Sequence, residues 1–159
     1  MKTIERHNYQ GNKIIQTRKI TFEPYRFCEY NMCLAMGLIQ RNLTPELLAR
    51  KKLKYRDSNN KYYGHCYHSS QALSYLMDTN ELIPMSAEDY RGEKHWWLQY
   101  DDRVYDCTAE QYYMVGKFPP YLNGKKSRWY GWKQRPQQIS INLTVKVLGD
   151  RLVEDKIIS

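Results

Sequence analysis

The sequence predicts a domain that combines α-helices with antiparallel β-strands. Three observations point to this class: apolar residues at helical spacing after Cys66, a hairpin pattern near residue 100, and a β-branched run from Ile14. The chain has 159 residues, enough for one domain with a full core and too few for two large ones. We therefore expect a single domain over 1–159.

Three parts of this domain differ in character. Residues 1–60 are expected to form a strand and helices, residues 61–134 hold the residues capable of chemistry, and residues 135–159 form a C-terminal segment. The chain has 15 Tyr and 4 Trp, and Tyr-rich chains form walls whose rings pack while their hydroxyls stay hydrated or bonded. The formal net charge is +8, which favours acidic partners, although scattered basic residues also serve solubility.

The first elements follow from local patterns. Residues 1–13 are polar and are expected to be mobile or loosely docked. The β-branched stretch 14–22 predicts a strand that Pro24 ends. Apolar residues in 25–40 predict a helix, with an interruption near Gly37 because glycine is a weak helix former.

A second helix is predicted to start at Thr44. Thr44 can cap it, Pro45 suits the first helical position, and Glu46 complements the positive end of the helix dipole. This helix is expected to run to about Lys54 and to be followed by a turn-forming loop over 56–61.

The next segment predicts a helix of about twelve residues with Cys66 in its first turn. Its apolar positions fit one helix face: Ala72, Leu73, Leu76 and Met77. After a short extended piece over 82–85, residues 95–100 and 103–106 read as two strands joined by an Asp-Asp turn.

The remaining chain is less regular. Pro and Gly punctuate residues 112–131, which predicts a loop. In residues 139–147 the apolar positions satisfy both a strand period and a helix period, so this segment stays undecided.

The four cysteines are expected to be free thiols. They are Cys28, Cys33, Cys66 and Cys107. The first residues contain no apolar stretch typical of a secretion signal, and no apolar run is long enough for a membrane span. We therefore expect a cytoplasmic protein in a reducing environment, without membrane attachment.

Cys66, His95 and Asp106 have the residue types and order of a thiol nucleophile, its base and the acid that orients the base. A thiolate is stabilised by a helix N-terminus and by an imidazolium. The two strands of the hairpin can bring His95 and Asp106 together. Taken singly, each residue is more typical of packing, a strand or a turn, and the ordered combination is what favours catalysis.

The start of the predicted helix also offers an oxyanion site. The backbone N–H of Cys66 is free of helical bonding there, and Gly64 allows close approach of a substrate. A second donor would come from upstream, where Asn60, Tyr62 and Tyr63 are the candidates.

Three short motifs resemble the transglutaminase-like branch of papain-like cysteine enzymes: Gly64-x-Cys66, His95-Trp96 and Asp106-x-Thr108. Over roughly residues 63–134 the chain also resembles small uncharacterised bacteriophage proteins. The motifs shared with them are Gly64-His65-Cys66-Tyr67, His95-Trp96, Asp106-x-Thr108-Ala109-x-Gln111 and Pro119-Pro120-Tyr121. The first 60 residues match no family that we can name.

The resemblance implies an α+β fold of the papain-like or transglutaminase-like kind, with the nucleophile helix packed on an antiparallel β-sheet. It implies a catalytic triad of Cys66, His95 and Asp106, and action in the host cytoplasm for a phage-encoded protein. One departure is Cys107, which stands where the family has proline and makes the turn after Asp106 less rigid.

The reaction expected from such a site is hydrolysis or acyl transfer through a thioester, without a cofactor. The substrate would be a protein, a peptide or a small amide, with acidic character favoured by the basic chain. We expect the triad's neighbours in these motifs to contact it: Tyr63, Gly64, His65, Trp96, Gln111 and Tyr121. The sequence carries no signal of oligomeric state.

A zinc site is the first alternative, because His and Cys are zinc ligands. The candidates are His65, Cys66, His68, His95 and Cys107. However, residues one and two apart on a helix point in different directions, so one ion could hardly collect His65, Cys66 and His68. Catalysis is therefore favoured over zinc binding.

A non-catalytic binding protein is the second alternative, with a host factor, nucleotide or nucleic acid as its ligand. Basic and aromatic residues alternate as on single-strand nucleic-acid surfaces: Lys125, Lys126, Arg128, Trp129, Tyr130 and Trp132. No helix-turn-helix or phosphate-binding loop is present, so nucleic acid is not favoured. A more economical role for this loop is one wall of the substrate cleft, together with Tyr112, Tyr113 and Tyr121.

Overall fold

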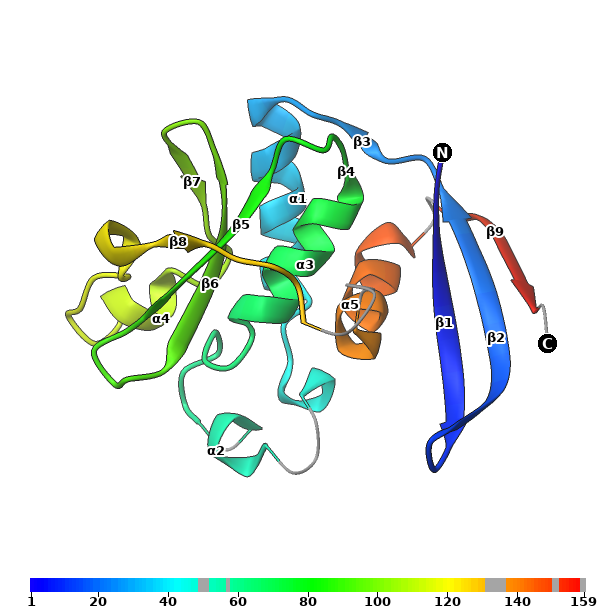
Figure 1. Cartoon of the computed structure of the whole chain (residues 1–159), viewed down its shortest axis with the longest axis horizontal. Helices are drawn as coiled ribbons and strands as arrows, with labels where there is room; N and C mark the ends of the chain where they lie inside the picture. Colours follow the sequence, from blue (N-terminus) through cyan, green and yellow to red (C-terminus); the bar gives the residue numbers. More distant parts are fainter. Residues whose placement is uncertain (49–51, 57, 131–136, 150–151, 158–159) are drawn as a thin grey trace.

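The protein is a mixed α+β structure with antiparallel sheets. A computed structural model describes residues 1–48, 52–56, 58–130, 137–149 and 152–157. Figure 1 shows two sheets at opposite ends of the molecule with helices between them. No helix in these described ranges is long and apolar enough to cross a membrane.

The larger sheet has the strand order β7-β6-β5-β8. Its neighbouring strands are antiparallel, and the pairing of β6 with β7 is the hairpin that the sequence predicts. Asp101 in the connecting turn has a positive φ of 54°, which suits Asp in a tight turn. The strands are β5 (Ile83–Glu88), β6 (Lys94–Tyr100), β7 (Arg103–Tyr105) and β8 (Lys125–Lys126).

The second sheet corrects the expectation for the first 13 residues. They form strand β1 (Lys2–Gln10), which pairs antiparallel with β2 (Lys13–Phe22), and β2 pairs in turn with β9 (Leu152–Ile157). Among the described β1 residues only Ile4 is a buried apolar residue. The strand is therefore specified by its pairing with β2, since a polar sequence gives little local signal.

The first helix, α1 (Glu29–Arg41), lacks the interruption expected at Gly37. A Cβ at Gly37 would meet no atom within 4 Å, so this glycine weakens an exposed helix position without changing the backbone path. Just before α1 in the chain lies the short strand β3 (Tyr25–Arg26), which pairs in parallel with the short strand β4 (Met77–Asp78).

The prediction of a single helix from Pro45 to Lys54 is wrong. Residues Pro45–Leu47 form one 3-10 turn, Leu48 is extended with ψ 148°, and a separate helix, α2 (Leu53–Arg56), follows. Thr44 makes no side-chain cap, so the start signal is used only for a single turn.

The loop expected over residues 112–131 contains short regular pieces in its described part. These are the end of α4 (Glu110–Tyr113), a 3-10 turn at Tyr121–Asn123, and the edge strand β8. Residues 131–136 lie outside the described part, and they include Trp132.

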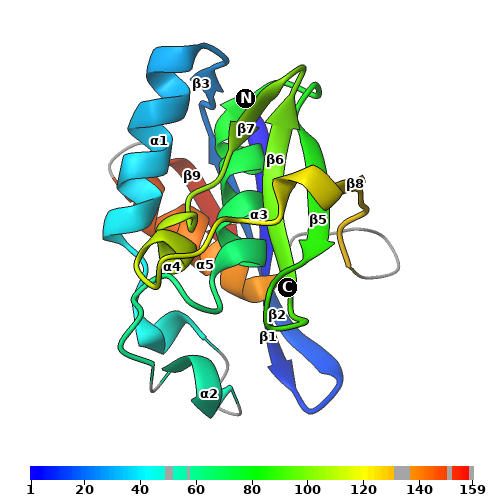
Figure 2. The same ribbon diagram turned by 90° about the vertical axis from the view of Figure 1, so that its left-hand side faces the viewer.

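The two central helices carry most of the core. The helix expected after Cys66 is α3 (Cys66–Leu76), and the undecided segment is a helix, α5 (Gln138–Leu148). Figure 2 shows α3 between α1 and β6, and α3 also packs against α5. One continuous set of buried apolar residues joins both sheets through these helices, from Ile20 in β2 to Leu98 in β6.

Candidate active site

Cys66 is the first residue of α3 and is half-buried. Its Sγ lies 3.8 Å from the backbone carbonyl oxygen of Lys94, the first residue of β6. No hydrogen bond joins the backbone N–H of Cys66 to another described residue, so this donor is available at the helix start. The thiol thus lies where the positive end of α3 meets the start of β6, an inner strand of the larger sheet.

His95 and Asp106 form a buried pair across the hairpin. His95 Nε2 lies 2.6 Å from Asp106 Oδ2, and both side chains are almost fully shielded from solvent. A carboxylate oxygen accepts, so Nε2 carries the hydrogen. The other ring nitrogen, Nδ1, is buried without a hydrogen-bond partner among the described residues, and it is therefore the nitrogen left to exchange a proton.

The imidazole is held in an aromatic slot. Trp97 stacks on it at 5.8 Å between ring centroids, and the edge of Tyr112 meets it at 4.8 Å. Burial alone would lower the pKa of His95, but the charge and hydrogen bond of Asp106, with a further contribution from Cys66, raise that pKa well above 6.5. The imidazole therefore readily takes up a proton next to Cys66.

Asp106 is held by two further residues. Thr108 donates to Oδ1 from its backbone N–H at 3.0 Å and from its hydroxyl at 3.3 Å. The Tyr121 hydroxyl donates to Oδ2 at 2.7 Å. The carboxylate that orients His95 is therefore itself fixed through both oxygens.

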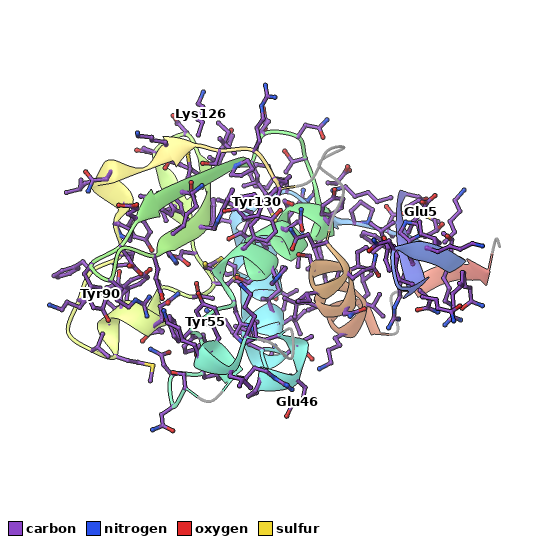
Figure 3. The ribbon with its side chains drawn as sticks, turned by 60° about the horizontal axis from the view of Figure 1, so that its bottom comes forward. Glu5, Glu46, Tyr55, Tyr90, Lys126 and Tyr130 are labelled. Atoms are coloured by element: carbon purple, nitrogen blue, oxygen red, sulfur yellow. The ribbon has the colours of Figure 1, made fainter. Side chains whose placement is uncertain are left out.

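A cleft of about 470 Å³ lies beside Cys66. Figure 3 labels two tyrosines of its wall, Tyr55 from α2 and Tyr130 from the loop after β8. Of the residues expected to contact the substrate, four line this cleft: Tyr63, Gly64, Trp96 and Gln111.

His65 and Tyr121 lie outside the lining of this cleft, contrary to expectation. His65 is buried beneath the helix start, where burial and the charge of Lys61 lower its pKa to about 4. The Tyr121 hydroxyl donates its hydrogen bond to Asp106. Tyr113, expected in the cleft wall, is exposed and contacts Phe118 instead.

Gly64 lines the cleft, and its surroundings give a further reason for a glycine at this position. Its φ is +87°, and a Cβ there would come within 2.6 Å of the Tyr55 side chain. The glycine therefore makes room for a tyrosine of the cleft wall and permits a left-handed turn before α3.

The candidate ligands of the zinc alternative do not gather in one cluster among the described residues. His68 Nδ1 bonds the Ser140 hydroxyl of α5 at 2.9 Å, and the Cys107 thiol is fully buried, which together with the Asp106 charge raises its pKa. In the described part of the chain, no group of three or more His, Cys, Asp or Glu side chains could hold a metal ion.

The upstream oxyanion candidates are largely engaged elsewhere. Asn60 donates its side-chain amide to the backbone carbonyl of Gln111 at 3.0 Å, and the Tyr63 hydroxyl bonds Glu93 at 2.8 Å. The backbone N–H of Cys66 is therefore the donor that the described residues offer most directly.

The turn between β5 and β6 contributes a part of the cleft that sequence reasoning missed. Asp89 accepts from Arg91 and from the Tyr112 hydroxyl, and Arg91 also donates to Gln111. Gln111 in turn donates to Thr108, which links the cleft wall to the Asp106 carboxylate. The polar sequence of this turn resembles any exposed hairpin, so it gave no signal of this role.

The basic and aromatic segment before residue 131 packs on α3. Tyr130 stacks on Tyr67 at 4.8 Å and donates its backbone N–H to the Tyr67 hydroxyl, while Trp129 stacks on Trp96 at 5.7 Å. These rings therefore form part of the cleft wall and its support, and Trp132 lies outside the described residues.

No protein-family model, no curated protein and no solved structure matches the chain.

Proposed function

We propose that the protein is a cysteine-dependent hydrolase or acyl transferase whose triad is Cys66, His95 and Asp106. One observation carries the proposal. The buried imidazole of His95 is bonded to Asp106 through Nε2, keeps Nδ1 free, and interacts with a thiol at the start of α3 beside a cleft.

The first half of the proposed reaction forms a thioester. His95 takes the thiol proton, the sulfur of Cys66 attacks the carbonyl carbon of an amide or ester, and the backbone N–H of Cys66 donates to the developing oxyanion. His95 then gives its proton to the leaving amine or alcohol, and the carbonyl re-forms as the thioester.

The second half returns the free enzyme. Water, or an amine in the case of transfer, attacks the thioester while His95 removes its proton, and the Cys66 sulfur leaves and recovers that proton. Asp106 keeps the imidazole in the required tautomer throughout. The three residues stand at a helix start, in a strand and directly after the next strand, and this order supports the proposed likeness to transglutaminase-like and papain-like enzymes. Because Cys66 must stay reduced, we propose action in a reducing compartment such as the cytoplasm of a phage host.

The proposed nucleophile is tested by site-resolved alkylation with iodoacetamide at mildly acidic pH. We expect Cys66 to react faster than Cys28, Cys33 and Cys107, because an imidazolium stabilises only its thiolate. His95→Gln should lower the alkylation rate of Cys66 by about tenfold or more. His7→Gln, which changes a histidine of β1, should leave that rate unchanged. Equal rates at Cys66 and exposed Cys33 would refute the proposal.

The acyl step is tested with p-nitrophenyl acetate and mass spectrometry. We expect an acetyl group on Cys66 that is lost again in water and is absent from the Cys66→Ala variant. Faster loss in the presence of glycine amide would indicate transfer, and loss at the same rate would indicate hydrolysis. A protein that never acquires acetyl at Cys66 would instead favour a purely binding role for the cleft.

A further inference from the structure

The charges that line the cleft are unequally paired. Both of its carboxylates are already occupied. Asp89 accepts from the Arg91 guanidinium at 2.7 and 3.1 Å, and Glu93 accepts the Tyr63 hydroxyl at 2.8 Å and an ion pair from Lys54. No carboxylate in the lining is therefore left to attract a positively charged substrate.

Two lysines in the described part of the chain line the cleft. Lys52 lies over the Tyr55 ring, whereas Lys94 is the lysine whose backbone contacts Cys66 and whose side chain has a different environment. Its ammonium has no carboxylate partner among the described residues and lies over two aromatic rings, 5.4 Å from the centre of Trp96 and 5.6 Å from that of Tyr130. Such contacts contribute only about 0.5–1 kcal/mol at exposed sites. They orient the lysine side chain over the rings and leave its ammonium free to bind an anion.

Lys94 is also close to the nucleophile. Its backbone carbonyl oxygen lies 3.8 Å from Cys66 Sγ, and both residues line the same cleft. The lining residues from Gln111 onward include no Asp or Glu, so they supply no carboxylate that could compete for Lys94. The unpaired charge that Lys94 brings to the cleft of the thiol is thus positive.

We propose that Lys94 is the anion-binding group of the cleft and that the substrate carries a carboxylate close to its reactive carbonyl. The inference rests on the proposed function and names its substrate class: an acidic peptide or a small carboxylated amide. The aromatic rings of Trp96 and Tyr130 hold the lysine stem over the cleft, and the ammonium pairs with the substrate carboxylate.

Two alkylating reagents of similar size test this inference on the intact protein. Iodoacetate carries a carboxylate and iodoacetamide is neutral, and both transfer their carbon to the sulfur with loss of iodide. The ratio of their rate constants at Cys66, measured by site-resolved mass spectrometry, reports attraction of the anion. Any change in the thiolate population affects both reagents equally and cancels in the ratio.

Removal of the charge should lower this ratio. We expect Lys94→Met to reduce the iodoacetate to iodoacetamide ratio at Cys66 by about three- to tenfold at low salt, and added salt should reduce the ratio of the unaltered protein toward the same value. Lys94→Arg should retain the ratio, and Lys94→Glu should lower it further.

The matched control is Lys126→Met. Lys126 is an exposed lysine of β8 on the same sheet, lies at the edge of the molecule in Figure 3, and is not part of the cleft lining. If Lys94→Met changes the ratio no more than Lys126→Met does, the anion subsite is refuted. That result would leave the proposed triad untouched, because the triad is judged by the effect of His95→Gln on the iodoacetamide rate alone.

Protection of Cys66 from iodoacetamide identifies the source of the carboxylate. Protection by N-acetylglutamate would support a small substrate, and protection only by an acetylated, amidated hexaglutamate peptide would support an acidic peptide. Either effect should be lost in Lys94→Met. If neither ligand lowers the alkylation rate of Cys66 below that of the protein alone, the inference is overturned.

Discussion

At the scale of single residues, oxygen Oδ2 of Asp106 is where His95 and Tyr121 meet. It accepts hydrogen bonds from His95 at 2.6 Å and from the Tyr121 hydroxyl at 2.7 Å. Tyr121 was expected to contact the substrate, and its position instead makes it a residue that fixes the acid of the triad. Tyr121 is thus a positioning residue, and it acts on the nucleophile only through Asp106 and His95.

Loss of the Tyr121 hydroxyl should affect both stability and the thiol. We expect Tyr121→Phe to lower the free energy of unfolding by about 0.5–1.5 kcal/mol and to slow alkylation of Cys66 by about two- to tenfold, because the carboxylate is oriented less firmly. Urea unfolding and site-resolved alkylation measure the two effects.

The neighbouring Tyr113 offers a matched control. Its hydroxyl bonds no described residue, so Tyr113→Phe should change neither quantity. A Tyr121→Phe protein that is less stable but alkylated at the rate of Tyr113→Phe would show a structural role only.

Gly64 and Gly92 illustrate two different reasons for a glycine, a backbone with positive φ and the lack of space for a side chain. Both have positive φ, 87° and 75°, but a Cβ at Gly64 would clash with Tyr55 and a Cβ at Gly92 would meet no atom within 4 Å. We expect Gly92→Ala to cost about 1 kcal/mol of unfolding free energy from backbone strain and Gly64→Ala to cost at least about 2 kcal/mol. Equal costs in urea unfolding would mean that Tyr55 moves aside freely.

At the scale of elements, helix α3 is fastened at the end opposite Cys66. The ammonium of Lys2, the first residue of β1, donates to the backbone carbonyls of Ser74 at 3.2 Å and Tyr75 at 3.1 Å, and also to that of Met77. These are carbonyls that the end of a helix leaves without helical partners. The strand missed by sequence reasoning therefore caps the helix that carries the nucleophile.

This cap should contribute measurably to stability. We expect Lys2→Met to lower the free energy of unfolding by about 1–3 kcal/mol, because three carbonyls lose a charged donor at the negative end of the helix. Lys13→Met, at the exposed start of β2, should change it by less than about 0.5 kcal/mol. Equal midpoints of the two variants in urea would contradict the capping role.

The elements divide according to how local their signals are. The helix after Cys66 and the hairpin that carries His95 and Asp106 were predicted, because an apolar face and a turn between strands are visible in neighbouring residues. Strand β1 was missed because its partner is β2 and its own sequence is polar. The spacing of apolar residues in 139–147 fits both a strand and a helix. The helix α5 is selected by its packing against α3 and β1.

The candidate site divides in the same way. Cys66 and His95 lie on predicted elements, and Asp106 follows directly after β7, one residue beyond the end of that strand. Their proximity follows from the predicted helix and hairpin. The partners of the triad come from segments without a periodic pattern, such as Tyr121 in the Pro-rich loop and Arg91 in a polar turn. Their roles depend on how the chain folds back, which residue spacing does not encode.

At the scale of the whole molecule, one apolar core connects the sheet of the triad to the sheet of β1, β2 and β9. Ile20 of β2 is 1% exposed and belongs to the same buried set as Leu73 of α3 and Leu98 of β6. A continuous core of this kind predicts that the molecule unfolds as one cooperative unit. The tryptophans of the described residues are Trp96 and Trp97 in β6 and Trp129 after β8, so their fluorescence reports mainly on the part that holds the cleft.

Substitution at Ile20 therefore tests the coupling between the two ends. We expect Ile20→Ala to lower the free energy of unfolding by about 2–5 kcal/mol and to shift the urea midpoint seen by tryptophan fluorescence as much as the midpoint seen by far-UV circular dichroism. Ile15→Ala, at a 55% exposed position of the same strand, should shift neither by more than about 0.5 kcal/mol. A fluorescence midpoint that stays in place while the dichroism midpoint falls would mean that the outer sheet unfolds separately from the sheet that carries His95.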